Sequence, residues 1–137
     1  MKKLVFILVI ALGSMNSIFA QLNISTNLRR DAVFDETKKE YVVISENAEE
    51  LTFFEFNKDF TMFKHTTPSI TSSYIIKSSK HNEENNTWEL EIMSDVGNVY
   101  HMIIDTANSN VRFIYTKDGS TYLVQHTIKK MWTSDNK

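Results

Sequence analysis

Short apolar runs alternate with polar clusters along most of the chain. After residue 30, runs of five to eight residues rich in Val, Ile, Phe and Tyr are separated by clusters of Asn, Asp, Gly, Ser and Lys. This spacing is typical of consecutive antiparallel strands. The predicted strands span residues 31–35, 41–45, 51–56, 60–66, 73–79, 87–93, 99–105, 111–116 and 121–128.

The segment TWELEIM, residues 87–93, shows the strand pattern most clearly. Trp88, Leu90 and Ile92 alternate with two glutamates, as expected for a half-buried strand. Asp118-Gly119 and the segment SDVGN around Gly97 predict tight hairpin turns. The connections leave little room for crossover helices, which excludes a parallel sheet. We therefore predict an all-β antiparallel meander of eight or nine strands, as an up-and-down barrel, a curved half-barrel or a sandwich.

The last apolar segment allows two structures. Val124, Ile128, Met131 and Trp132 follow a helical i, i+4, i+7, i+8 spacing as well as a strand pattern. A short C-terminal helix over residues 121–132 is therefore the alternative to a final strand.

The first twenty residues have the layout of a secretory signal peptide. Lys2 and Lys3 precede an apolar run from residue 4 to 12, and Ala20 stands before a cleavage point at Gln21. We expect residues 1–20 to be removed, residues 21–30 to form a polar arm, residues 31–129 to form one β domain and residues 130–137 to form a tail. The expected location is the periplasm or the extracellular space, and the Lys- and Asn-rich, Pro-poor composition is typical of a bacterial protein.

Charge and cysteine content exclude several classes of protein. Without the first twenty residues the chain has 13 Lys and Arg against 17 Asp and Glu, a net charge of −4 that is spread along the sequence. A nucleic-acid partner would need a clustered basic face. The absence of cysteine excludes disulfides, thiolate metal sites, a cysteine nucleophile and a lipid anchor on cysteine. No segment after the leader is apolar for long enough to form a membrane-spanning helix.

The four histidines, His65, His81, His101 and His126, are far apart in sequence and lack the close spacing of metal ligands. His101 and His126 each alternate with β-branched neighbours. In a meander one strand lies between theirs, so they are separated by about 9.6 Å, too far to share an ion. No metal site is predicted.

Catalytic patterns are missing as well. Glu89 shares a strand face with Glu91 at about 6.6 Å, which fits a solvated face better than a glycosidase pair. No Gly-x-Ser-x-Gly segment occurs, and three glycines are too few for a phosphate-binding loop. We expect no enzymatic activity, no catalytic residue and no cofactor.

The segment FFEFNKDFTMFKH, residues 53–65, predicts an aromatic hairpin whose register depends on its turn. A two-residue Lys58-Asp59 turn lacks the usual Asn-Gly or Asp-Gly sequence. A three-residue turn over residues 57–59 is therefore favoured. It pairs Phe56 with Phe60 and Phe54 with Met62 on the core face.

The same register leaves Phe53 and Phe63 together on the opposite face. Either another part of the chain covers them, or they form an exposed patch for a partner. The segment VYHMIID is also apolar on both faces, with Tyr100 and Met102 on one side. These four residues, Phe53, Phe63, Tyr100 and Met102, are the candidate ligand- or partner-binding residues.

Two functional hypotheses follow. The first is an exported, non-enzymatic binding module that holds an apolar or amphipathic small molecule inside the barrel, since such sites are lined by aromatic residues and methionine. The second is a protein-interaction or envelope-structural domain that docks another exported protein through the aromatic patch or a strand edge.

Overall fold

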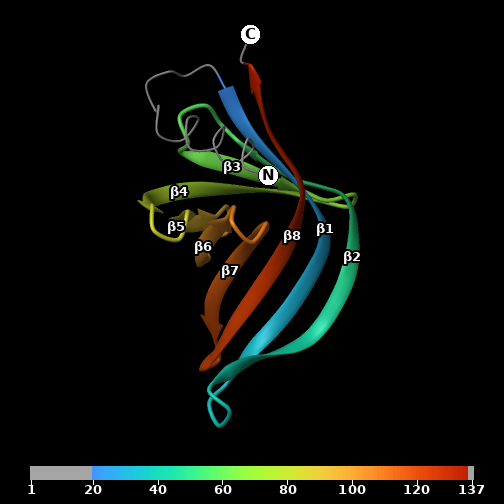
Figure 1. The fold of residues 1–137 in the computed structure, drawn as a ribbon, viewed down its shortest axis with the longest axis vertical. Coiled ribbons are helices and arrows are strands. Elements are labelled where there is room, and N and C mark those ends of the chain that lie inside the picture. The colour runs from blue at the N-terminus through green and yellow to red at the C-terminus, as the bar shows by residue number, and fades with distance from the viewer. Residues whose placement is uncertain (1–19, 136–137) are drawn as a thin grey trace.

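The computed structural model describes residues 20–135, which form eight antiparallel strands closed into a barrel (Figure 1). Each strand pairs with the next, and the last pairs with the first. The predicted all-β meander and its closure are confirmed. The strands are β1 (Ala20–Asp35), β2 (Glu40–Phe56), β3 (Met62–Thr66), β4 (Thr71–Asn82), β5 (Thr87–Ser94), β6 (Val99–Asp105), β7 (Asn110–Lys117) and β8 (Ser120–Asp135).

Alternation along each strand sorts the side chains into an inner and an outer row. On β5, Trp88, Leu90 and Ile92 are buried while Glu91 is exposed, as predicted. The same rule fills the core, which also contains the following residues: Leu22, Ile24, Phe54, Phe56, Phe60, Phe63, Met102, Ile104, Val111, Phe113, Val124 and Met131.

The hairpin turns follow the sequence chemistry. Lys117 pairs with Ser120, and the two residues between them have the positive φ angles of a two-residue turn, 52° at Asp118 and 81° at Gly119. Gly97, in the β5–β6 turn, has φ 88°. Both predicted turns are therefore confirmed.

The predicted polar arm over residues 21–30 is wrong, because these residues form most of β1. Leu22 and Ile24 enter the core, and the polar residues between and beyond them are satisfied by hydrogen bonds. Asn23 Nδ2 donates to Ser134 Oγ at 3.2 Å, and Ser25 Oγ donates to the Lys130 carbonyl at 3.4 Å. The polar composition of residues 21–30 gave no indication of a strand that pairs with both β2 and β8.

The C-terminal alternatives are also resolved. Residues 120–135 form one strand, so the helical alternative is wrong, as is the prediction of a tail over residues 130–137 for its described part. Two predicted strands, 41–45 and 51–56, merge into β2, which reduces nine strands to eight. The signal-peptide prediction concerns residues 1–19, which lie outside the described residues, and Ala20, which begins β1.

The hairpin between β2 and β3 has a different register from the predicted one. Phe56 pairs with Phe63 and Phe54 pairs with His65, across a loop of residues 57–61. Asn57 Oδ1 accepts hydrogen bonds from the backbone N–H groups of Thr61 at 2.8 Å and Met62 at 3.1 Å. This Asn-centred loop is longer than the predicted turn because the side chain replaces backbone partners.

The changed register moves several phenylalanines. Phe60 lies in the loop at φ 55°, and its ring folds back onto Phe56 with 5.1 Å between centroids. Phe63 now points inward beside Phe56, while Phe53 lies on the other face and Met62 is exposed. The predicted cross-strand pair of Phe53 and Phe63 is therefore wrong.

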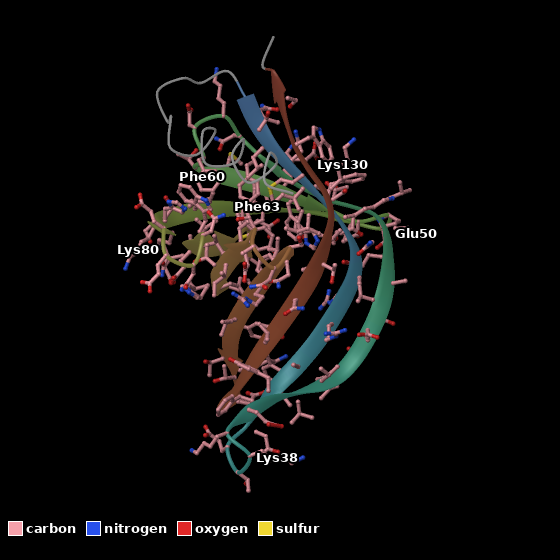
Figure 2. The ribbon with its side chains drawn as sticks, viewed as in Figure 1. Lys38, Glu50, Phe60, Phe63, Lys80 and Lys130 are labelled. Atoms are coloured by element: carbon pink, nitrogen blue, oxygen red, sulfur yellow. The ribbon has the colours of Figure 1, made fainter. Side chains whose placement is uncertain are left out.

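Three strands are much longer than the rest. β1, β2 and β8 have 16, 17 and 16 residues, and with β7 they form a curved wall that continues beyond the barrel toward the β1–β2 turn (Figure 1). Figure 2 shows side chains crowded in the barrel around Phe60 and Phe63, whereas the β1–β2 ribbon runs down to Lys38. The wall makes one end of the barrel a slanted mouth. No helix among residues 20–135 has the length and apolar character needed to cross a membrane.

Candidate functional site

A cavity of about 650 Å³ occupies the barrel interior on the side of the slanted mouth. It reaches from the β5–β6 turn across to β8 and β1. Its lining contains Arg29, His65, Tyr74, Asn98, Val99, Tyr100, Phe113, Tyr115, Thr116, Lys117, Val124 and His126. Six of the eight strands, all but β2 and β5, contribute at least one of these residues, and Asn98 comes from the β5–β6 turn.

The inner rows of single strands pass from packed core into this cavity. On β6, Ile104 and Met102 are fully buried, and Tyr100, the next inward residue, lines the cavity. On β7, the inward row passes from the buried Val111 to Tyr115 at the cavity. Apolar side chains thus fill one half of the barrel, and phenolic side chains with polar tips surround the empty half.

The aromatic walls meet edge to face around Tyr100. Its ring centroid lies 5.5 Å from that of Tyr115, 6.1 Å from Tyr74 and 6.4 Å from Phe113, at interplanar angles of 68° to 87°. Burial, followed by neighbouring groups such as Tyr100, raises the pKa of Tyr74, and burial also raises the pKa of Tyr115. Both phenols therefore stay protonated and can donate hydrogen bonds.

Arg29 brings a cation to the cavity, and a carboxylate two residues along β1 holds it. Its Nε donates to Asp31 Oδ1 at 2.8 Å, and its Nη2 donates to Asp31 Oδ2 at 3.1 Å. The hydrogen bond with Asp31 raises the pKa of Arg29, against the opposing effect of burial. This two-point contact fixes the guanidinium and balances its charge.

A second polar group is formed by Glu49, His126 and Thr26, which come from β2, β8 and β1. Glu49 Oε1 lies 2.8 Å from His126 Nδ1 and accepts a hydrogen bond from Thr26 Oγ1 at 3.0 Å. His126 is 1% exposed. The His65 ring lies edge to face against His126, with centroids 5.5 Å apart, and stacks on Phe54 at 4.3 Å.

The pKa values of Glu49 and His65 are shifted in directions that burial and pairing explain. Burial acts to raise the pKa of Glu49, but the hydrogen bonds from His126 and Thr26 outweigh it and hold the pKa below its ordinary value. Burial, reinforced by His126, lowers the pKa of His65 to about 4. At neutral pH Glu49 is thus a carboxylate and His65 is an uncharged imidazole.

The four predicted site residues lie in three different places. Tyr100 lines the cavity, and Met102 lies directly below it in the packed core. Phe63 is a core residue that contacts Phe56 and Tyr74, with centroids 4.8 Å from each. Phe53 is half-buried on the outer face of β2. The structure therefore brings Tyr100 and Met102 together and separates Phe53 from Phe63.

Sequence reasoning missed Arg29, Glu49, His65 and His126 as neighbours. The sequence shows that His126 alternates with Val124 and Ile128, but it suggested His101 and not His65 as the neighbouring histidine. His101 faces outward, where its Nδ1 lies 2.6 Å from Glu91 Oε1 and its Nε2 lies 3.5 Å from Glu89 Oε1. The shared face predicted for the two glutamates is confirmed, since both flank one imidazole.

Comparisons with protein-family models, curated proteins and solved structures found no significant match. Within residues 20–135, no three His, Asp or Glu side chains are grouped so that they could hold a metal ion.

Proposed function

We propose that this protein is an exported, non-enzymatic binding module that holds one amphipathic organic molecule in the cavity of its barrel. The observation that carries the proposal is the division of the interior into a packed half and an empty half. A volume of about 650 Å³ lies within the range of small-molecule sites, about 300–1,000 Å³. Phe113 and Val124 supply apolar contact, whereas the tyrosines, histidines and Arg29 supply polar groups.

The wall chemistry favours an amphipathic ligand over a purely apolar one. An apolar molecule would leave the hydroxyl groups of Tyr74, Tyr100 and Tyr115 without partners once water is expelled, at a cost of about 1–3 kcal/mol for each. A ligand with a flat ring and polar substituents satisfies both the faces and the tips of these residues. The slanted mouth, where the cavity reaches Asn98 in the β5–β6 turn and Lys117 beside the β7–β8 turn, provides the entrance.

Filling the cavity tests this proposal. Val124→Trp places a large ring in the empty half and is expected to abolish uptake of Nile red, an uncharged fluorescent probe. Val43→Trp is the matched control, because Val43 is 52% exposed on β2 and lies outside the cavity. Native mass spectrometry of protein purified from an expressing host would identify retained molecules. Equal dye uptake by both variants, or no uptake by the unmodified protein and no retained mass, would contradict the proposal.

A second candidate function is docking of an extended strand on the free edge of β2. Most residues between 40 and 52 of β2 pair with β1, while β3 pairs with β2 only from Phe53 to Phe56. Natural edges are usually protected by lysine or proline, but this segment contains neither. It exposes 59% of Ile44 and 69% of Leu51.

The charges on this edge select the partner. Residues 40–52 contain no basic residue, and three of their four glutamates, Glu40, Glu46 and Glu50, are exposed, so the expected partner is a strand of another exported protein with basic side chains. A lysine–valine alternating peptide should shift the NMR signals of residues 40–52, and the glutamate–valine peptide should not. Shifts scattered over the whole surface, or equal shifts with both peptides, would rule this candidate out.

A further inference from the structure

An irregularity in β1 and β2 turns Glu49 toward the cavity. Thr26 pairs with Thr52, but Leu28 pairs with Ala48, so the three residues 49–51 of β2 have no partner on β1. Leu51 takes a left-handed conformation at φ 49°. A non-glycine residue in that region is strained, and bulges of this kind re-aim side chains next to functional sites.

The re-aimed carboxylate fixes the proton of a buried imidazole. Because Glu49 is ionised, its Oε1 accepts a hydrogen bond, and the atom 2.8 Å away is His126 Nδ1. Nδ1 therefore carries a proton, and the neutral tautomer that this contact selects has its lone pair on Nε2. Carboxylates orient histidines in this way where the other ring nitrogen serves a ligand.

Nε2 of His126 is available to such a ligand. His126 lines the cavity, and within residues 20–135 the one hydrogen bond of its imidazole ring is the contact with Glu49. The neighbouring His65 is uncharged and has a buried Nε2 without a hydrogen-bond partner. The wall of the cavity thus offers imidazole nitrogens without hydrogen-bond partners to a bound molecule.

The same wall gives little support to an ionised group. Arg29 already makes two hydrogen bonds to Asp31, and the Glu49 carboxylate lies behind His126. A carboxylate or phosphate bound beside His126 would leave water without gaining an unpaired cation there, because Lys117, the other cation of the lining, is exposed at the end of β7. A hydroxyl group, by contrast, donates a hydrogen bond to the lone pair of an imidazole nitrogen, and no ionic charge has to leave water.

We infer that the cavity takes an uncharged, flat, hydroxyl-bearing compound of the phenol or aromatic-alcohol class, whose hydroxyl donates to His126 Nε2. The ring of the ligand lies among Tyr100, Phe113 and Tyr115. This inference rests on the proposed function and names the ligand class of the same site.

A pair of probes of nearly equal size tests the inference. 2-Naphthol has the hydroxyl donor, and 2-fluoronaphthalene replaces it with a group that cannot donate. The unmodified protein is expected to bind 2-naphthol about tenfold more tightly, the value of one neutral hydrogen bond of about 1.4 kcal/mol. Fluorescence titration measures both affinities.

The variant to compare is the double substitution Glu49→Leu with His126→Phe. Replacing both partners avoids leaving a buried carboxylate unpaired, so the barrel is expected to fold. Its preference for 2-naphthol should fall to about onefold while 2-fluoronaphthalene binds as before. His81→Phe is the control, because His81 stacks on Trp88 away from the cavity lining and should leave the preference unchanged.

¹⁵N NMR of the histidine rings gives a readout that does not depend on binding. Nε2 of His126 is expected to show the shift of an unprotonated nitrogen, and a proton on Nε2 would overturn the inference. Equal affinity of the unmodified protein for both probes, or a preference that survives in the double variant, would also overturn it. Those results leave the binding function intact, whereas failure of both probes and of Nile red to bind would remove the proposed function itself.

Discussion

The two halves of the barrel are built on the same strands, yet one is packed and the other is empty. Phe56, Phe63 and Leu90 fill the packed half and are at most 2% exposed. In the empty half, Tyr100 and Tyr115 continue the inner rows of β6 and β7, in which Met102 and Val111 are fully buried, but they surround a cavity of about 650 Å³. Strand geometry is common to both, so the difference comes from which side chains the inner rows present. Apolar side chains fill one half of the barrel, whereas rigid aromatic rings with polar tips surround the cavity in the other half.

The largest expected difference between the halves is the cost of removing a phenylalanine. Phe56→Ala should lower the free energy of unfolding by about 3–5 kcal/mol, because the ring is enclosed by Phe60 and Phe63. Phe113→Ala should cost about 2 kcal/mol, because one side of this ring already faces empty space. Urea unfolding measures both, and equal costs would show that the halves are packed alike.

Adding volume should also destabilise the packed half more than the empty half. Val111 and Val124 lie on neighbouring strands, the first in the packed half and the second at the cavity. Val111→Phe should destabilise the protein by about 1–3 kcal/mol through overpacking. Val124→Phe should change stability by less than about 1 kcal/mol while it weakens Nile red binding. A large loss of stability in Val124→Phe would indicate that the cavity is closed in solution.

The loop that closes the packed half depends on one side chain. Asn57→Ala removes the acceptor for the N–H groups of Thr61 and Met62 and should cost about 1–2 kcal/mol. Lys58→Ala, in the same loop but exposed, is the control and should change stability by less than about 0.5 kcal/mol. If the two variants unfold at the same urea concentration, the Asn57 contacts do not set the hairpin register.

The smallest expected effect is a pH dependence that originates at the cavity wall. The pKa of His65 is about 4 in the folded protein and near 6.5 in the unfolded chain, so the unfolded chain binds the proton first as pH falls. The contribution of uncharged His65 to the free energy of unfolding is complete well above pH 6.5 and is lost as the pH falls toward 4. Between pH 7.5 and pH 6 the loss should be about 1 kcal/mol at most.

His65→Phe keeps the stack on Phe54 and removes this proton, so its stability should change less over the same interval. Glu49 does not interfere, because its lowered pKa places its own loss of stability at lower pH. His101→Gln, on the outer face, is the control. An unchanged pH profile in His65→Phe would show that His65 is not buried as described.

The interior of the barrel was predictable from the sequence to the extent that alternation defines it. The rows of β5 and the Asp118-Gly119 turn follow from local chemistry, as does the shared face of Tyr100 and Met102 on β6. Residues 21–30 were not predictable, because their polar side chains are buried only through partners on β8 and β2. The hairpin register failed for a related reason, since Asn57 makes a longer loop than the turn rules favour.

The sequence by itself determined most of the strands and their antiparallel order, because a period of two and short connections leave few other folds. Tertiary structure alone decided which side chains meet across the barrel. Glu49 and His126 are 77 residues apart in sequence. A bulge that no local sequence pattern predicts brings Glu49 Oε1 to 2.8 Å from His126 Nδ1. The strand tilt and register of the closed barrel set where the inner rows converge, and therefore where the interior is filled and where it stays open.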